Sequence, residues 1–527
     1  MELVLKVAAA EALAAALDLA VDAVAVRLPP APPRGWWAEA ASWRGRARER
    51  GVKFYLVWDR LVRQAKWPQA MELLTAAARL APDALVLRDL GLAREAQRLY
   101  PNLARHGAGN LGLHNSPGLE SAAALGFSRV RLEVPVPLKD LALVRRETAM
   151  PLEVALPPVC LGGPGFSFEE DSRDPGALFP EPGRIDADWL SGALEMLPAL
   201  AQLGVEAVQV GPEFTQAHPL KQVAPLFQAV LAASPGERSG VLAAAREVWA
   251  ALGPGPGEGA LAPEAARLER SFRSKGIEPP ALWAWLRDLK DWGRVWLEAR
   301  GYGEAAALAR EWRGPLVVLL TPEDYAAFLP EHRRWQPRRL VWRLPVLIPE
   351  TSLTFYRQAI RTLTQGGFGR FVAGDWGGAA LVRAAGGAVY ADQTLGLLNS
   401  GALDAARAAG VARFCLPPGA RAPEALELIR LSPPGSFWGY LYQVPALAVW
   451  FREGEAARRP KVPAGRGLRW AREGNLAVLC PAAPVLLTDP QLLQRLSSLV
   501  ISLPRSGLPW GRAPFRAAIR EPRRPRG

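Results

Sequence analysis

The stretch ALVLRDLGLAREAQRLYPNLARHGAGNLGLHNSPGLESAAALGFSRVR, residues 84–131, places short apolar runs before and after helical stretches. This strand, helix, strand, helix, strand order is typical of a parallel sheet whose strands are joined by helices. Residues 370–414 show the same order. Within the two copies, LGLHNSPGLESAAALGFSR (111–129) and LGLLNSGALDAARAAGVAR (395–413) agree at ten of nineteen positions without a gap. The agreement indicates a duplicated unit of strands and helices.

The residues that the two copies share suit the ends of helices. Asn and Ser are favoured as N-cap residues, and Gly is favoured just after the last helical residue. The matching pairs are Asp89 and Asp375, Gly91 and Gly377, Asn115 and Asn399, Ser116 and Ser400, and Gly126 and Gly410. We therefore expect the repeated Asn, Ser and Gly residues to form helix ends rather than to take part in chemistry.

Working outward from this stretch, residues 1–235 contain eight candidate strands. They are 3–8, 23–28, 53–59, 84–89, 104–109, 129–134, 152–156 and 207–211. Helical stretches fill the intervals. Eight parallel strands, each followed by a helix, predict a closed (βα)8 TIM-like barrel whose functional groups lie at the carboxyl ends of the strands. The alternative is a doubly wound open sheet, but no G-x-G-x-x-G follows the first strand.

The rest of the chain divides into three further parts, so the expected class is α/β with four regions. These are the barrel (1–235), a helical linker domain (236–314), a second α/β unit that repeats part of the barrel (315–435) and a β-rich basic C-terminal region (436–527). In the helical part, ALWAWLRDLKDWGRVWLEARG places Trp285, Trp292 and Trp296 near one helical face. Such a stripe favours a core or interdomain contact over a platform for base stacking.

Charge is distributed unevenly along the chain. The net charge is +13, yet residues 1–235 hold 24 basic and 26 acidic side chains, so the remainder carries +15. A basic C-terminal region could neutralise the phosphates of RNA. The alternative is a solvated, Arg-rich tail.

The sequence gives no sign of a membrane partner. Its apolar start is interrupted by Glu2, Lys6, Glu11 and Asp18, and no window holds about twenty uninterrupted apolar residues. We therefore expect a cytoplasmic protein.

The order of motifs in residues 84–131 resembles peptidase family U32, the collagenase-like proteases. The family pattern is roughly D-x-G, then H-x-S-T-Q-x-N-x-H-N-S, then L-G-F-x-R-V. The resemblance runs from KFYLVWDRLVR (53–63) through LEVALPPVCLGGPGF (152–166) to VEAVQVGPEF (205–214), and so covers about the first 235 residues. It implies a barrel fold and one of two activities. One is peptide cleavage, and the other is oxygen-independent hydroxylation of RNA bases or quinone precursors with an iron–sulfur cluster and prephenate.

The chain departs from the family pattern at its cysteines. It keeps Cys160 and Gly165, but Ser167 stands where the second signature cysteine belongs. An iron–sulfur cluster takes about four thiolates, and the other two cysteines, Cys415 and Cys480, lie beyond the barrel. We therefore predict no cluster and no other cofactor. The histidines form no metal-binding motif either, so no metal site is predicted.

Several polar residues of the family pattern are retained at the predicted mouth of the barrel. They are Asp59, Asp89, His106, Asn110, Asn115, Glu133, Cys160 and Glu213. In a hydrolase His106 would be the base, Asp89 the group that orients it and Cys160 the nucleophile. The structural alternatives are a half-buried imidazole, a helix cap and a packing thiol.

Three functions remain open at this point. The first is a U32-type peptidase homologue with an eroded active site, acting on a peptide or protein substrate. The second is an RNA-modification protein or an accessory to one, which binds RNA through the basic C-terminal region. The third is a catalytically degenerate barrel that acts as a binding scaffold.

Overall fold

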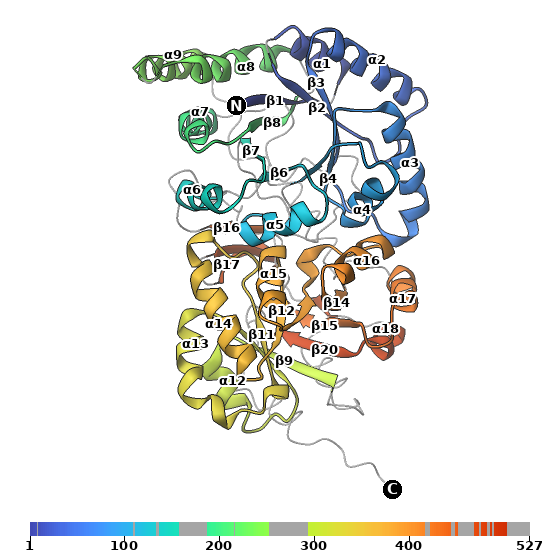
Figure 1. Cartoon of the computed structure of the whole chain (residues 1–527), viewed down its shortest axis with the longest axis vertical. Coiled ribbons are helices and arrows are strands. Elements are labelled where there is room, and N and C mark those ends of the chain that lie inside the picture. Colours follow the sequence, from blue (N-terminus) through green and yellow to red (C-terminus); the bar gives the residue numbers. More distant parts are fainter. Residues whose placement is uncertain are drawn as a thin grey trace.

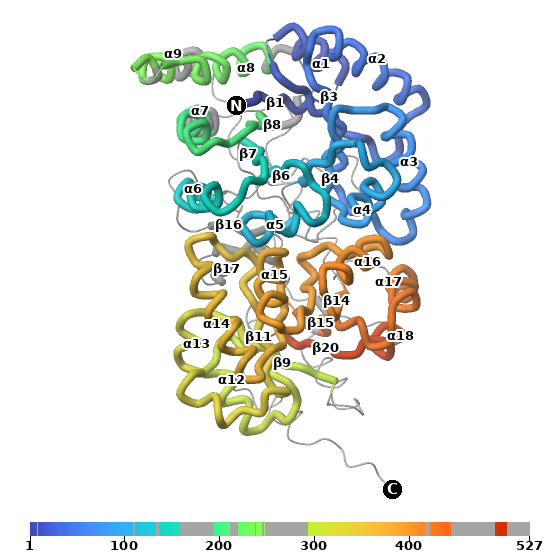
Figure 2. The backbone as a smooth tube through the Cα atoms, in the orientation of Figure 1, coloured from blue at the N-terminus to red at the C-terminus, as the bar shows by residue number. Residues whose placement is uncertain are grey.

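The computed structural model places two barrels one above the other (Figure 1). It describes residues 1–7, 9–19, 21–108, 111–132, 136–156, 187–214, 217–234, 236–251, 294–416, 422–443, 448–451, 468–473, 476–481, 485–486 and 490–502. Figure 2 shows the chain completing the first barrel, from blue to green, before it enters the second, from yellow to red.

The first barrel is a closed ring of eight parallel strands. The strands are β1 (Glu2–Val7), β2 (Ala23–Arg27), β3 (Lys53–Trp58), β4 (Ala84–Leu87), β5 (Arg105–Gly107), β6 (Arg129–Leu132), β7 (Leu152–Leu156) and β8 (Ala207–Phe214). The helices are α1 (Ala10–Leu17), α2 (Trp36–Glu49), α3 (Trp67–Leu80), α4 (Leu90–Leu99), α5 (Ser116–Ala124), α6 (Leu138–Glu147), α7 (Ala187–Gln202) and α8 (Ala217–Ala232). All eight strands predicted from the sequence are present, and the TIM-like fold is confirmed.

Alternation along the strands creates two apolar layers in this barrel. In β1, Val4 faces the lumen, where it packs with Tyr55 and Val86. Its neighbours Leu3 and Leu5 face outward and pack in the large core beneath the helices. Side chains of a strand point alternately to opposite faces, so each strand contributes both to the filled lumen and to the contact with the helices.

The second half of the structure contains another ring of eight parallel strands. They are β9 (Val295–Ala299), β10 (Leu316–Leu319), β11 (Leu340–Arg343), β12 (Arg370–Ala373), β13 (Ala388–Ala391), β14 (Val411–Leu416), β15 (Phe437–Gln443) and β20 (Ser498–Ser502). The helices are α12 (Tyr302–Leu308), α13 (Pro322–Phe328), α14 (Leu353–Gln365), α15 (Trp376–Ala384), α16 (Ser400–Ala408), α17 (Ala422–Arg430) and α18 (Pro490–Arg495).

The second α/β unit extends further than the partial repeat expected from the sequence. Strand β9 comes from the segment predicted to be helical, and β15 and β20 come from the β-rich C-terminal region. The helical placement of Trp296 is wrong, because this residue lies in β9, whereas its expected position in a core is confirmed by its buried side chain in the lumen. The apolar run VWLEA is short enough to be a buried strand, and periodicity alone does not distinguish a short buried strand from a segment of buried helix. Trp285 and Trp292 lie outside the described residues.

The remaining described elements surround the two rings. Helix α9 (Arg238–Ala251) follows the first barrel. In the C-terminal part, β19 (Val485–Leu486) pairs with β15, and β16 (Ala448–Phe451), β18 (Leu476–Pro481) and β17 (Leu468–Glu473) form an antiparallel sheet. Among the helices that the structure describes, none is long and apolar enough to cross a membrane.

The repeated stretches occupy equivalent places in the two rings, and their predicted caps are confirmed. Asn115 caps α5 by accepting a hydrogen bond from the backbone N–H of Gly118 at 3.0 Å. Asn399 caps α16 by accepting one from Ala402 at 2.8 Å. Gly126 and Gly410 follow these helices with φ of 81° and 86°, a backbone conformation that favours glycine.

The same Asn side chains also join the two barrels. Helix α4 packs against α16 and α5 packs against α15, along the line where the barrels meet in Figure 1. The Asn399 amide donates to the carbonyl of Val62 and to the carboxylate of Asp89, both at 2.8 Å. The Asn115 amide donates to the carbonyl of Ile348 at 2.9 Å. The interface is therefore related by an approximate two-fold symmetry.

Backbone and side-chain contacts extend this symmetry. The N–H of Ser400 donates to Gln64, and the N–H of Ser116 donates to Glu350, both at 2.8 Å. Gln64 and Glu350 lie in short helices that follow the third strand of each ring, η1 (Gln64–Lys66) and η6 (Glu350–Ser352). Every one of these segments follows the carboxyl end of a strand, so the rims of the two barrel mouths meet at this interface.

We predict that Gly91 tolerates no side chain. A Cβ at this position would lie 2.4 Å from Asn399 Oδ1 and 2.6 Å from the backbone nitrogen of Ala402. Gly91→Ala should lower the free energy of unfolding by about 1–3 kcal/mol, the usual cost of overpacking, as measured by urea denaturation. The matched control is Gly45→Ala in α2, where nothing lies within 4 Å; it should raise stability by about 0.5–1 kcal/mol. Equal effects of the two substitutions would contradict the close interface.

Candidate functional site

Three charged side chains meet at the mouth of the first barrel. Lys6 and Arg27 lie at the carboxyl ends of β1 and β2, and Asp59 follows β3. Asp59 Oδ2 lies 3.2 Å from Lys6 Nζ and 3.0 Å from Arg27 Nη2. The three side chains are 15%, 23% and 21% exposed. Their position is the one at which TIM-barrel proteins place functional groups.

The electrostatics of this group favour an anion. Burial alone would raise the pKa of the Asp59 carboxyl, but Arg27, Lys6 and Arg131 hold it well below its usual range. The carboxylate is thus ionised at neutral pH and is a weak base. Three cations face one carboxylate among the described residues, and guanidinium and ammonium groups are the usual partners of carboxylate and phosphate ligands.

Sequence reasoning identified Asp59 but missed Lys6 and Arg27. Each is an inward-pointing residue near the carboxyl end of a predicted strand, in LVLKVA and AVAVRL. A basic residue near the carboxyl end of each of two successive predicted strands is the sequence signal that could have identified them.

His106 lies inside the lumen, where it is 6% exposed. Its ring packs edge-on against Tyr55, with centroids 5.1 Å apart. Burial, together with the charge of Arg129, lowers the pKa of His106 to about 3. The imidazole is therefore neutral at neutral pH.

Asp89 lies in the interface between the barrels and is fully buried. Its carboxylate accepts hydrogen bonds from the backbone N–H groups of Leu92 and Val62, at 3.0 and 2.9 Å, and from Asn399. Burial raises the pKa of Asp89 to about 6, against the lowering effect of these hydrogen bonds. Asp89 thus caps α4, and none of these contacts joins it to His106.

The other predicted site residues are placed as follows. Asn115 caps α5 and contacts the second barrel. Cys160, Asn110 and Glu133 lie outside the described residues, as does the side chain of Glu213 in β8.

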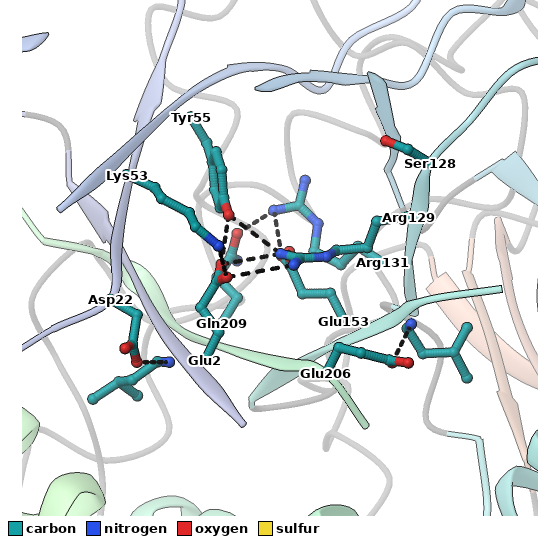
Figure 3. Close-up of polar contacts among 12 residues, drawn as sticks. Glu2, Asp22, Lys53, Tyr55, Ser128, Arg129, Arg131, Glu153, Glu206 and Gln209 are labelled. Carbon is teal, nitrogen blue, oxygen red and sulfur yellow. Dashed lines mark hydrogen bonds and ion pairs between the residues drawn. The ribbon is translucent and has the colours of Figure 1, made fainter. Parts of the chain in front are cut away.

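A second polar network fills the lumen at the amino ends of the strands (Figure 3). Glu2 accepts hydrogen bonds from Lys53 at 2.7 Å, from the Tyr55 hydroxyl at 2.5 Å and from Arg129 at 3.0 Å. Burial would raise the pKa of the Glu2 carboxyl, but these three partners lower it to about 2. Polar groups at the amino ends of barrel strands contribute to stability rather than to catalysis.

The network continues toward the mouth through Arg131. This fully buried residue of β6 lies 3.8 Å from Glu153 and donates to Gln209. Its charge also lowers the pKa of Asp59. The stabilising network and the mouth are therefore electrostatically coupled.

Comparison with known proteins bears on the first barrel. The model of peptidase family U32 matches residues 9–156. Within these residues the chain is similar to peptidase family U32. The match runs from just before α1 to the end of β7, and so includes six of the eight strands of the first barrel, β2 to β7.

Two solved structures are similar to part of the chain. The U32 peptidase Mk0906 is 12% identical, with a TM-score of 0.28, over 41% of this chain and 94% of its own. Thiamine phosphate pyrophosphorylase from Pyrococcus furiosus is 15% identical, with a TM-score of 0.28, over 44% of this chain and 96% of its own. No curated protein matches the chain in sequence.

We predict that Glu2 makes the stability of the first barrel sensitive to acid. A carboxyl whose pKa falls from 4.5 to about 2 on folding contributes about 3 kcal/mol above pH 4.5, and this contribution is lost as pH falls toward 2. The difference in unfolding free energy between the native protein and Glu2→Gln should thus be large at pH 7 and vanish near pH 2. Glu95→Gln, which breaks an exposed ion pair with Arg98, should change stability by less than about 1 kcal/mol. A pH-independent difference for Glu2→Gln would contradict the network.

Proposed function

We propose that this U32-family protein is a binding scaffold whose first barrel holds a small anion at its mouth, and that it does not cleave peptides. The observation that carries the proposal is the group formed by Lys6, Arg27 and Asp59. These side chains are partly exposed at the carboxyl ends of adjacent strands, and Arg131 adds a third positive charge behind them.

The environments of the expected catalytic residues support the absence of cleavage. A general base works best with a pKa near the working pH, and His106 has a pKa of about 3 in a closed lumen. Asp89 already binds two backbone N–H groups and Asn399. These environments are those expected of a peptidase homologue whose active site is eroded.

The residues also argue against an iron–sulfur cluster. The whole chain has three cysteines, whereas such a cluster takes about four thiolates. Cys415, the cysteine whose side chain the structure describes, is buried in the second barrel. Among the described residues no group of three or more His, Cys, Asp and Glu side chains could hold a metal. No step of the proposed function therefore runs through a cluster.

Anion binding is tested by titrating the purified chain with inorganic phosphate and with succinate in a calorimeter. Arg27→Met should weaken binding of the better anion at least tenfold, since a charge-assisted hydrogen bond contributes about 1.5–3 kcal/mol. Arg98→Met, which removes an exposed arginine paired with Glu95, is the matched control and should bind as the native protein does. Absence of binding, or equal binding by Arg27→Met, would contradict the proposal.

Peptide cleavage is tested separately with gelatin and a fluorogenic peptide library. We expect no cleavage above background. Cleavage that disappears in His106→Ala or Cys160→Ala would restore the peptidase hypothesis, and it would do so whatever the result of the anion titration.

A second candidate function, RNA modification or assistance to it, rests on charge. Residues 236–527 carry +15, and the chain ends in GRAPFRAAIREPRRPRG. Binding through phosphates weakens steeply with salt. On this hypothesis the full chain should bind RNA, with an affinity that falls at least tenfold between 50 and about 200 mM salt, and removal of residues 505–527 should abolish binding in a gel-shift assay. Salt-insensitive binding, or binding retained by the truncated chain, would exclude this role for the tail.

A further inference from the structure

A buried polar layer lies at the carboxyl end of the lumen in the second barrel. Glu298 comes from β9, Arg343 from β11 and Asp392 from the residue after β13. All three side chains are less than one tenth exposed. Glu298 lies two residues after Trp296, and Arg343 lies two residues after Val341, and both of these earlier residues face the lumen. Residues two apart in a strand point to the same face. The charged residues therefore also face the lumen, one layer closer to the mouth.

The three charges form a carboxylate, guanidinium, carboxylate row. Arg343 Nη1 lies 2.7 Å from Glu298 Oε1, and Arg343 Nε lies 3.7 Å from Asp392 Oδ2. Beside the row, the amides of Gln393 and Gln443 donate to each other at 3.0 Å. Burying charges costs several kcal/mol for each ion, so their presence at this end of a barrel marks a candidate site.

The local potential near this row is negative. Burial raises the pKa of the Tyr440 hydroxyl well above its usual range, and the charges of Asp392 and Glu298 raise it further, while Arg343 lowers it by less. The pKa of the Cys415 thiol is likewise raised by burial and by Asp392. Both groups remain protonated, so the carboxylates are the dominant charges there and favour a cation.

An aromatic floor lies beneath the polar layer. Trp296 and Tyr390 have ring centroids 6.1 Å apart, and those of Trp438 and Tyr440 are 5.3 Å apart. Trp438 is 1% exposed, and its indole N–H has no hydrogen-bond partner among the described residues. A buried donor without an acceptor costs about 1–3 kcal/mol. The lumen therefore offers an unused hydrogen-bond donor next to aromatic rings.

We propose that the second barrel binds a small organic amine at the carboxyl end of its lumen. The ammonium group pairs with the carboxylates of Glu298 and Asp392, which outnumber the single Arg343 guanidinium beside them. The apolar body packs on the aromatic floor, and a polar atom of the ligand accepts a hydrogen bond from Trp438. Aromatic rings together with carboxylates are a common environment for organic cations. This site is separate from the anion site of the first barrel, and neither proposal depends on the other.

The experiment titrates the full chain with three probes of matched shape in a calorimeter. Tyramine carries the ammonium group, 4-ethylphenol lacks it, and 3-(4-hydroxyphenyl)propionate replaces it with a carboxylate. We expect tyramine to bind at least tenfold more tightly than either of the others. Glu298→Gln should weaken tyramine binding about tenfold, and Trp438→Phe should weaken it severalfold through loss of a hydrogen bond.

The control variant is Arg98→Met, which alters an exposed side chain of the first barrel and should change tyramine affinity by less than about twofold. Circular dichroism checks the fold of each variant. If Glu298→Gln does not fold, because Arg343 then loses its nearest partner, the result for Trp438→Phe decides. The proposal is overturned if tyramine does not bind, if 4-ethylphenol or the propionate binds equally well or better, or if Trp438→Phe binds tyramine as the native protein does.

Discussion

The double role of two asparagine side chains holds this structure together. Asn399 caps α16 with its carbonyl oxygen, while its amide reaches across to Asp89 and to the Val62 carbonyl in the other barrel. Asn115 does the same in the opposite direction with the carbonyl of Ile348. Because one short side chain serves both purposes, the helices must approach closely, and this requires glycine at position 91. The interface fixes the two mouths rim against rim.

This constraint changes the meaning of the motif that the chain shares with the U32 family. Asp89 and Asn115 belong to that motif, yet both are engaged in capping and in the interface. The polar groups at the two barrel mouths are others, and they differ between the barrels. The first mouth gathers cations around Asp59, whereas the second gathers carboxylates around Arg343. Two barrels of the same fold therefore offer opposite charge, and this contrast underlies the two proposed ligands.

Much of the architecture could be predicted from the sequence, because it follows from local patterns. The eight strands of the first barrel and the caps at Asn115 and Asn399 depend on residues near one another in the chain. The closure of the second ring could not be predicted in this way. Strands β15 and β20 pair in the folded chain, but other strands lie between them in the sequence, so no local pattern indicates that they are neighbours. His106 shows the same limit for the site. Its strand has three residues, too few for alternation to distinguish a lumen position from a catalytic mouth.

The most direct test of the account is a double-mutant cycle across the interface. Asp89→Ala, Asn399→Ala and the double variant are unfolded with urea, and the cycle cancels the separate capping contribution of each side chain. If the pair joins the barrels, the coupling free energy between the two substitutions is at least about 1 kcal/mol, as expected for a buried hydrogen bond to a charged group. Effects that add to within about 0.3 kcal/mol would contradict the account.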